Sequence, residues 1–384
     1  MDRSKWEVDN KTFGEVFNLF MGRTPSRDND SYWQDGKYEW LSIGDMGDTK
    51  YLSKTKEMIS EEAVANMQQV PENTVVMSFK LSIGKVGITS IPLYTNEAIM
   101  AFPPKEGYQI MPTFLYYYLQ AYKWQPANRA VMGKTLNKAV ISSARISIPS
   151  VADQQRIVAE LDCLNEMIAV KQEQLKEFDK LAQSIFYDMF GDPIKNERGW
   201  ETDVIGNVVS EKSYRGSIAN IEGKVWLLNL DMVESNTGRV IEKLMVPNDK
   251  TDGSVTTFNE DYVLYSKLRP YLNKVVMPDS SGYCTTELVT LLPNKTILNR
   301  YYLTSLLRSD SFVDYICGKV AGAKMPRVSM KDFRILYIPL PPLSLQQQFA
   351  EKISAIEAQK ELVKQSIAET QHLLDYTMDK YFNE

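Results

Sequence analysis

The chain has 384 residues, of which 43% are hydrophobic and 24% charged, so it can form two or three folded domains and is not disordered. It carries 44 Lys and Arg against 49 Asp and Glu, and no apolar run is long enough to span a bilayer. The single histidine, His372, argues against His-based zinc sites and Ser-His-Asp triads. Three cysteines without a metal-ligating pair, and no apolar leader in the first residues, predict a reducing cytoplasm.

The same succession of residues occurs twice, about half the chain length apart. The segment from Trp40 to Met46 matches the segment from Trp226 to Met232 in order and in residue type. Agreement of order, spacing and type argues against coincidence, and the sequence predicts a tandem duplication. The other matched pairs are Trp6 with Trp200, Gly14 with Gly206, residues 75–78 with 263–266, Glu97 with Glu287, Ile148-Pro149 with Ile338-Pro339, and Gln154-Gln155 with Gln346-Gln347.

Each half begins with a globular part whose patterns predict a mixed α+β module. Short strands rich in Val, Ile and Tyr are expected at residues 74–79 and 262–266. Helices are expected near residues 113–122 and 300–308. A proline-containing hinge then ends each module, because proline restricts the backbone to extended conformations.

A helical segment of about 40 residues follows each hinge, and most of the chain's excess of acidic residues falls in these two segments. Apolar residues recur there at alternating spacings of four and three, which is typical of a coiled-coil seam. We expect the two helices to pack against each other antiparallel, with the globular parts at opposite ends; packing of each helix on its own globular part is the alternative. The residues expected in this helix–helix spacer are Ile157, Leu161, Leu164, Ile168, Ile353, Ile356, Val363 and Ile367.

Basic residues gather at equivalent points of the two halves. No acidic residue lies between Glu106 and Asp153, where lysines and arginines alternate with tyrosines, and residues 262–278 and 315–331 carry only positive charges. Such segments are suited to track phosphates, although a solvated basic face is the alternative. Two charged modules on a stiff spacer suit double-stranded DNA, which presents separated sites in successive grooves.

Nine basic residues are candidates for DNA contact. Most are expected at phosphates, whereas Arg269 or Arg327 is expected to read guanine, worth about 1 to 3 kcal/mol. A loop-bracing role is the alternative for Arg327, because it follows Pro326. The candidates are Lys80, Lys85, Lys134, Lys138, Lys267, Arg269, Lys274, Lys324 and Arg327.

Catalytic motifs are missing from the sequence. The Gly133-Lys134-Thr135 run lacks the earlier glycine of a phosphate-binding loop, because that position is Asn128. A glycine-rich dinucleotide fingerprint is also missing. We therefore predict no catalytic residue and no metal site.

Together the motifs resemble the specificity subunit of type I restriction-modification systems over essentially the whole chain. They are residues 266–274, 322–329, the hinge at 338–343 with Gln346 to Gln348, and a closing long helix. Their counterparts in the first half are residues 78–86, 133–137 and 148–157. The first hinge departs from the family pattern, because Pro149 is followed by Ser150 instead of a second proline.

The resemblance implies a non-catalytic reader of double-stranded DNA with a bipartite target. Target-recognition domains are expected at residues 1–150 and 193–341, and spacer helices at 151–192 and 342–384. The implied partners are two methyltransferase subunits, which hold S-adenosylmethionine, and two restriction/translocase subunits, which use ATP and Mg²⁺. This chain itself needs no cofactor. The alternatives are a duplicated coiled-coil adaptor that binds proteins without DNA specificity, and an RNA-binding module.

Overall fold

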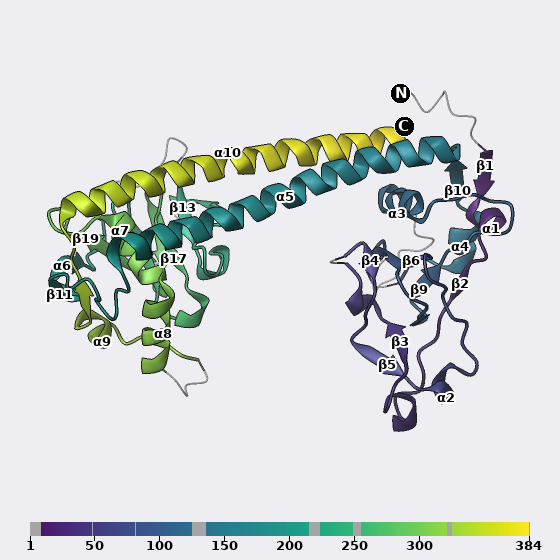
Figure 1. Cartoon of the computed structure of the whole chain (residues 1–384), viewed down its shortest axis with the longest axis horizontal. Coiled ribbons are helices and arrows are strands. Elements are labelled where there is room, and N and C mark those ends of the chain that lie inside the picture. Colours follow the sequence, from purple (N-terminus) through teal and green to yellow (C-terminus); the bar gives the residue numbers. More distant parts are fainter. Residues whose placement is uncertain are drawn as a thin grey trace. The chain divides into compact units, whose positions relative to one another are not determined.

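The structure is a computed structural model, which describes residues 9–47, 49–80, 82–124, 136–214, 223–248, 255–320 and 325–383. The chain forms two compact units, Met1–Val170 with Ile367–Glu384 and Lys171–Ser366 (Figure 1). Each unit contains one mixed α/β module together with one part of each long helix. This division runs through both long helices, so the predicted bounds of four consecutive domains stay a prediction.

The first unit is built from three small sheets. The central one has five strands in the order β2-β9-β6-β7-β4, and the second has three in the order β5-β3-β8. The third is an antiparallel pair, β1 with β10, which joins the start of the module to its end. The strand bounds are β1 Asp9–Thr12, β2 Phe20–Met21, β3 Tyr38–Leu41, β4 Tyr51–Leu52, β5 Glu57–Ile59, β6 Val75–Ser78, β7 Val86–Thr89, β8 Tyr94–Thr95, β9 Ile99–Ala101 and β10 Arg145–Ile148.

A core of aromatic and aliphatic side chains fills the first unit. Every residue of β6 is buried, since helix α3 packs on β6 and β7. Phe13 in helix α1 packs against Phe17 and Phe102, with ring centroids 5.8 Å apart in both pairs. The helices of the module are α1 Phe13–Val16, α2 Glu61–Val64, α3 Pro112–Ala121 and α4 Lys138–Ser143.

The second unit repeats this plan with two four-stranded sheets, β12-β19-β16-β17 and β14-β13-β18-β15, and the antiparallel pair β11 with β20. The strand bounds are β11 Thr202–Val204, β12 Val209–Ser210, β13 Lys224–Leu228, β14 Leu244–Pro247, β15 Val255–Phe258, β16 Val263–Ser266, β17 Val275–Val276, β18 Gly282–Thr285, β19 Leu288–Pro293 and β20 Tyr337–Pro339. The helices are α6 Ile205–Val208, α7 Arg300–Arg308, α8 Asp310–Lys319 and α9 Met330–Arg334.

The strand pairing confirms the internal repeat. The strand that contains the matched tryptophan pairs in parallel with a later strand in both units, β3 with β8 and β13 with β18. The matched strands β6 and β16 each form an antiparallel hairpin with the next strand. The predicted fold class is therefore confirmed: two mixed α/β modules related by duplication, with two long helices.

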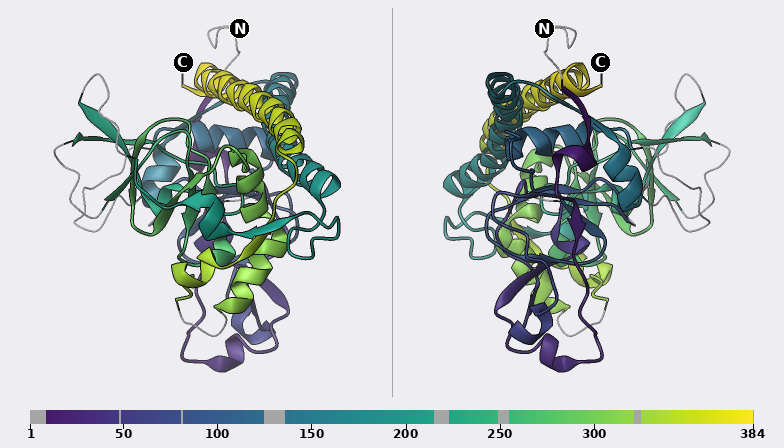
Figure 2. Two further views of the ribbon diagram at one scale, coloured as in Figure 1. Left: turned by 90° about the vertical axis from the view of Figure 1, so that its left-hand side faces the viewer. Right: turned by 90° about the vertical axis from the view of Figure 1, so that its right-hand side faces the viewer.

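Each long helix has 40 residues, α5 Val151–Phe190 and α10 Leu343–Phe382. The two helices lie side by side within each unit (Figures 1 and 2), and the colours of α5 and α10 run in opposite directions in Figure 1, so the helices are antiparallel. In the first unit the Tyr381 hydroxyl donates to Glu160 at 2.5 Å, and in the second Lys360 Nζ donates to Asp179 at 2.7 Å. Glu160 near the start of α5 thus pairs with the end of α10, whereas Asp179 further along α5 pairs with an earlier residue of α10. This order of pairing is that of antiparallel helices.

The apolar stripes of these helices pack against the modules as well as against each other. In the first unit the buried stripe residues of α5 share one core with Phe114 of α3 and Leu374 of α10. In the second unit those of α10 share a core with Phe186 and Tyr302. Both predicted modes of packing thus occur, and the role of the two helices as a spacer between the modules stays a prediction. Of the stripe residues, Ile157, Leu161, Leu164, Ile168, Ile353 and Ile356 are buried, while Val363 and Ile367 are half-buried.

None of the helices in the described part of the chain is long and apolar enough to cross a membrane.

Candidate DNA interface

Two loops that the sequence singled out meet in the second unit. The hairpin loop between β16 and β17 lies against the segment that precedes α9. Arg269 N donates to Pro326 O and Val328 N donates to Lys267 O, each at 2.8 Å, and Leu268 forms a β-bridge with Arg327. We call this arrangement, residues 267–269 with 326–328, the second loop junction. It brings two motifs that are distant in sequence to one place.

Arg269 is held at this junction in a left-handed backbone conformation with φ of 49°. The residue is exposed, and among the described residues no hydrogen bond or ion pair engages its guanidinium. Pro270 follows it and is buried, so the loop turns sharply and leaves the arginine side chain outside. A left-handed non-glycine residue is uncommon and indicates a position that the surrounding structure fixes.

Arg327 is also exposed, but its guanidinium has a partner. Its Nη2 donates to Glu287 Oε1 at 2.7 Å. The backbone of Glu287 is anchored to the same hairpin loop, because its carbonyl accepts from Lys267 N at 3.2 Å. The other carboxylate oxygen of Glu287 is buried and has no hydrogen-bond partner among the described residues.

The first unit has a corresponding junction. Leu136 N donates to Phe79 O at 3.2 Å, at the positions matching Val328 and Lys267. Lys80 follows and is half-buried, and its charge acts on Glu97. The pKa of Glu97 is held below its ordinary value, chiefly by the hydroxyl of Thr24, which donates to it at 2.5 Å. A carboxylate thus lies beside the loop cation in both units.

Two further candidate lysines reach backbone carbonyls. Lys85 Nζ donates to Met46 O at 2.7 Å, and Lys274 Nζ donates to Leu230 O at 2.9 Å. In both units the acceptor belongs to the short turn after the strand that carries the matched tryptophan, Trp40 or Trp226. Both lysines are half-buried. Each therefore ties its hairpin loop to this turn, a role that its charge alone did not suggest.

The other candidates are more isolated. Lys138 is exposed in the first turn of α4, which Asn137 caps through Val140 N at 2.9 Å. Lys267 is half-buried in the second loop junction. Lys134 and Lys324 lie outside the described residues. All nine assignments to DNA contact stay predictions.

The aromatic residues of the basic segment are core residues. Tyr117 and Tyr118 are each 4% exposed and belong to the core of the first unit. Burial and a hydrogen bond to Asp162 raise the pKa of Tyr117. These rings are therefore not a stacking surface for bases. Trp40 and Trp226, which begin the matched segments of the repeat, are core residues as well, 3% and 2% exposed.

One glutamine in each half joins the module to its long helix. Gln154 accepts from Met111 N at 2.8 Å and donates to Gln109 O and Pro149 O, both at 3.0 Å. Both glutamines are fully buried. Gln346 makes the same three bonds, with Asn299 N at 2.8 Å, Ile297 O at 2.9 Å and Pro341 O at 2.8 Å. These glutamines fix the start of α3 and of α7 against α5 and α10.

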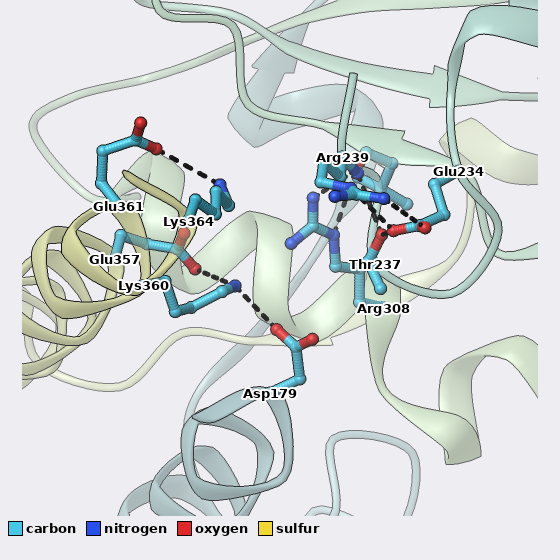
Figure 3. A network of polar contacts seen from close by, with 10 residues as sticks. Asp179, Glu234, Thr237, Arg239, Arg308, Glu357, Lys360, Glu361 and Lys364 are labelled. Carbon is cyan, nitrogen blue, oxygen red and sulfur yellow. Dashed lines mark hydrogen bonds and ion pairs between the residues drawn. The ribbon is translucent and has the colours of Figure 1, made fainter. Parts of the chain in front are cut away.

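A group of polar residues lies where the second module meets the two long helices (Figure 3). Lys360 lies between Asp179 and Glu357, at 2.7 and 2.8 Å. Burial opposes its charge, but the two carboxylates outweigh this and raise the pKa of Lys360. Arg308 is half-buried, and loss of hydration lowers its pKa; its Nε donates to Val275 O at 3.0 Å.

Gly238 is required beside this arginine. Its φ is 64°, and an added Cβ would lie 1.8 Å from Val275 O and 2.3 Å from Arg308 Nη2. The adjoining turn is closed by Arg239, which forms two hydrogen bonds to Glu234 at 2.8 and 3.1 Å. Any side chain at this glycine would displace the Arg308 guanidinium.

The part of the chain that the structure describes contains no group of three or more His, Cys, Asp or Glu that could hold a metal ion.

The family model of the type I restriction-modification DNA specificity domain matches this chain twice, at residues 4–180 and at residues 231–372. The chain belongs to this family. The resemblance predicted from the repeated motifs is thereby confirmed, and the duplication explains why one domain model matches two parts of a single specificity subunit.

Relatives of this specificity subunit align over most of their lengths. The type I restriction enzyme MjaIX specificity subunit of Methanocaldococcus jannaschii is 25% identical over 383 residues, which cover 90% of this chain and 85% of that protein. The EcoDI specificity subunit of Escherichia coli is 21% identical over 407 residues, covering 96% and 85%. A chain solved in work on complex assembly and conformational transition of the type I restriction-modification system has a TM-score of 0.61 at 17% identity, covering 98% and 97%. At this identity the likeness shows the fold.

Sequence reasoning missed two kinds of site residue in the specificity subunit: Glu287 beside Arg327, and the buried glutamines Gln154 and Gln346. It named Lys85 and Lys274 but missed that their side chains bind backbone carbonyls. The glutamines and Glu287 were visible only as matched positions of the repeat. That match was the usable signal, because a polar residue kept at the same place in two modules has the same contacts to make in both.

Proposed function

We propose that this specificity subunit reads a bipartite, asymmetric target in double-stranded DNA, each unit recognising one half-site. The observation that supports this most directly is the loop junction that recurs in both units with positive side chains on it. Arg269 and Arg327 are exposed at the second junction, and Lys80 lies at the first. Lysine and arginine at paired loops supply the phosphate contacts and the guanine contacts that sequence-specific binding needs.

The two half-sites should differ in sequence. The second junction presents two arginines, each able to form a bidentate pair with the O6 and N7 acceptors of guanine. The first presents Lys80 next to Phe79, and lysine acts as a point charge without a planar donor pair. The same backbone framework therefore carries different reading groups, and an asymmetric target follows.

The two long helices would act as the ruler that sets the unread gap between half-sites and as the dock for partner subunits. Apolar side chains on their surfaces are exposed, including Val170 on α5 and Leu362, Leu373 and Tyr376 on α10, each more than half exposed. Apolar groups exposed in this number on helices are typical of protein interfaces. We assign these surfaces to two methyltransferase subunits.

In this assignment the chain itself is not an enzyme and acts in the cytoplasm. S-adenosylmethionine would belong to the methyltransferase subunits, which would modify adenine. ATP and Mg²⁺ would belong to two restriction/translocase subunits. This chain would contribute the choice of sequence and the geometry of assembly.

The test is to co-express the chain with the methyltransferase subunit encoded beside it and to map modified adenines across the host DNA. A bipartite motif with a fixed gap, lost when this chain is omitted, is the expected result. As an internal control, Arg269→Ala combined with Arg327→Ala should degrade one half-site and leave the other. A stable complex with no sequence-dependent methylation would overturn the proposal in favour of the protein-binding adaptor.

A further inference from the structure

The second loop junction treats its two arginines differently. Arg269 has no hydrogen-bond or ion-pair partner for its guanidinium among the described residues, whereas Arg327 donates through Nη2 to Glu287 at 2.7 Å. A contact to phosphate needs only a positive charge, but a contact to a base edge needs a guanidinium held in one orientation. The presence of a carboxylate on one of two neighbouring arginines therefore has a functional meaning.

We propose that Glu287 is a specificity-determining positioning residue, which orients Arg327 for a base edge and disfavours its use on phosphates. This inference rests on the proposed function of the subunit as a DNA reader. One Nη2 hydrogen is engaged by the carboxylate. The remaining donors of the guanidinium are left for the two acceptors of guanine in the major groove.

Both members of this pair are fixed by the same loop. Leu268 bridges to Arg327, and Lys267 N donates to the carbonyl of Glu287 at 3.2 Å. Glu287 directly precedes β19, whose first residue, Leu288, pairs with Ser266 at the end of β16. The ion pair therefore lies at the ends of two central strands, and its geometry is set by backbone contacts on both sides.

The pair has too little burial to serve mainly as a fold stabiliser. The side chain of Arg327 is 54% exposed and that of Glu287 is 29% exposed. Ion pairs at such exposure contribute little to stability, because solvent screens the charges and the long side chains lose freedom. Its stronger effect is on charge: the carboxylate lowers the local positive potential that draws in phosphates of any sequence.

Glu287 also retains an unused acceptor. Its Oε2 is buried and unpartnered among the described residues. A buried carboxylate oxygen that lacks a hydrogen-bond donor can accept a hydrogen bond as soon as a nearby donor moves toward it. Rotation of the Arg327 guanidinium onto both oxygens would be the step that locks it in register on binding.

The first unit has a looser version of the same device. The positive charge of Lys80 helps to lower the pKa of Glu97, but the carboxylate of Glu97 accepts its hydrogen bond from Thr24. The ammonium group of lysine has no plane of donors that could be oriented. Glu97 can therefore lower the positive charge near Lys80 but cannot fix the direction of its hydrogen bonds. The effect on discrimination is therefore expected in the second half-site.

The test uses the full chain in complex with its methyltransferase subunits and compares binding to the mapped target with binding to every single-base variant of it. Glu287→Gln should reduce discrimination about tenfold at one base pair of one half-site. It should raise affinity for unrelated DNA. Arg327→Ala should act at that same base pair, and the double variant should lose no more there than Arg327→Ala alone.

The matched control is Glu211→Gln, which removes the same charge from the two-bonded surface pair of Glu211 with Arg334 in the same unit. It should leave discrimination unchanged. Glu287→Asp keeps the negative charge but has a shorter side chain. It should lower discrimination without raising the affinity for unrelated DNA. This result would distinguish the effect of orienting Arg327 from the effect of the negative charge.

Unchanged discrimination in Glu287→Gln, or a loss at a base pair that Arg327→Ala does not affect, would overturn the inference while the proposed function stands. A wild-type complex that shows no sequence preference would instead overturn the proposed function, and this inference with it.

Discussion

The two units share their backbone devices and differ in the side chains that those devices present. Both have a buried glutamine at the start of a long helix, a lysine that ties the hairpin loop to the turn after β3 or β13, and a loop junction. At the junctions, however, one unit carries Lys80 and the other carries Arg269 and Arg327. The difference indicates that the framework is the common part of the duplicated module and the loop side chains are its variable part.

The attachment of each module to the helices differs in the same way. In the first unit Lys50 and Tyr117 both contact Asp162 of α5, at 2.7 and 2.5 Å. In the second, the carboxylates of Asp179 and Glu357, which flank Lys360 on the two helices, act by their charge on Arg308 of α7. Polar attachment is thus achieved with unrelated residues, whereas the glutamine bonds are repeated.

The largest effect is expected from the repeated glutamines. Gln154→Ala and Gln346→Ala should each destabilise their own unit by about 3 kcal/mol, because a buried amide and two carbonyls lose their partners. Hydrogen exchange should increase at residues 109–111 in the first variant and at 297–299 in the second. Gln155→Ala, at the exposed neighbouring position, is the control and should change neither. Equal loss of protection in both units would mean that the two are not independent repeats.

A smaller effect is expected from the ion pairs of Lys360, which join the two helices in the second unit. Lys360→Met should destabilise that unit by about 1 to 2 kcal/mol, since Asp179 and Glu357 lose the cation between them and both carboxylates are themselves partly exposed. Chemical denaturation followed by hydrogen exchange would localise the loss. Lys364→Met, whose 3.4 Å contact with Glu361 lies on the surface, should cost less than about 0.5 kcal/mol. A comparable cost for the two variants would mean that the Lys360 ion pairs of Figure 3 do not stabilise the helix pair.

The salt dependence of DNA binding should distinguish the lysines that bind backbone carbonyls from the lysines and arginines that bind phosphates. Arg269→Ala should lower the slope of log affinity against log salt by about 0.9, the value for one lost phosphate contact. Lys85→Met and Lys274→Met should leave this slope unchanged, because their ammonium groups already bind Met46 O and Leu230 O. Both variants should still lower the affinity for the preferred DNA sequence, since each lysine holds its hairpin loop in place. If either lysine variant lowers the slope by the amount expected for one phosphate contact, that lysine binds a phosphate after all.

The smallest effect concerns the helix pair in the first unit. Burial, together with the hydrogen bond to Glu160, raises the pKa of Tyr381 to about 12. Since this folded value exceeds the unfolded value of about 10, the stabilisation is fully present below pH 10 and is lost as the pH rises toward 12. Tyr381→Phe should cost about 1 kcal/mol at pH 7 and progressively less between pH 10 and pH 12. A wild-type advantage that persists at pH 12 would contradict the role of this hydroxyl.

Much of the fold followed from the sequence because its signals are local or repeated. The spacing of apolar residues predicted two long helices, which the structure places at Val151–Phe190 and Leu343–Phe382. Matched residues half a chain apart predicted the duplication, and the strand pairing of β3 with β8 and of β13 with β18 confirms it. Each of these signals lies within one segment or repeats in order along the chain.

The candidate site was less accessible to sequence reasoning, since its contacts join distant residues. The alternation of lysines with tyrosines was read as one basic aromatic surface, yet Tyr117 and Tyr118 face the core. The helical period decides which face of α3 is buried, and the partners that bury it come from β6, β7 and α5. Charge alone also could not tell Lys274, bound to a carbonyl, from Arg269, which is exposed.

By itself the sequence determined the family, the duplicated α+β plan and the two long helices, because periodicity and repetition are properties of the chain in order. Only the tertiary structure decided which positive groups face solvent, which tie one loop to another, and that Glu287 stands beside Arg327. The physical reason is that hydrogen bonds and ion pairs act over about 3 Å, so their partners are fixed by how sheets and loops bring remote segments together.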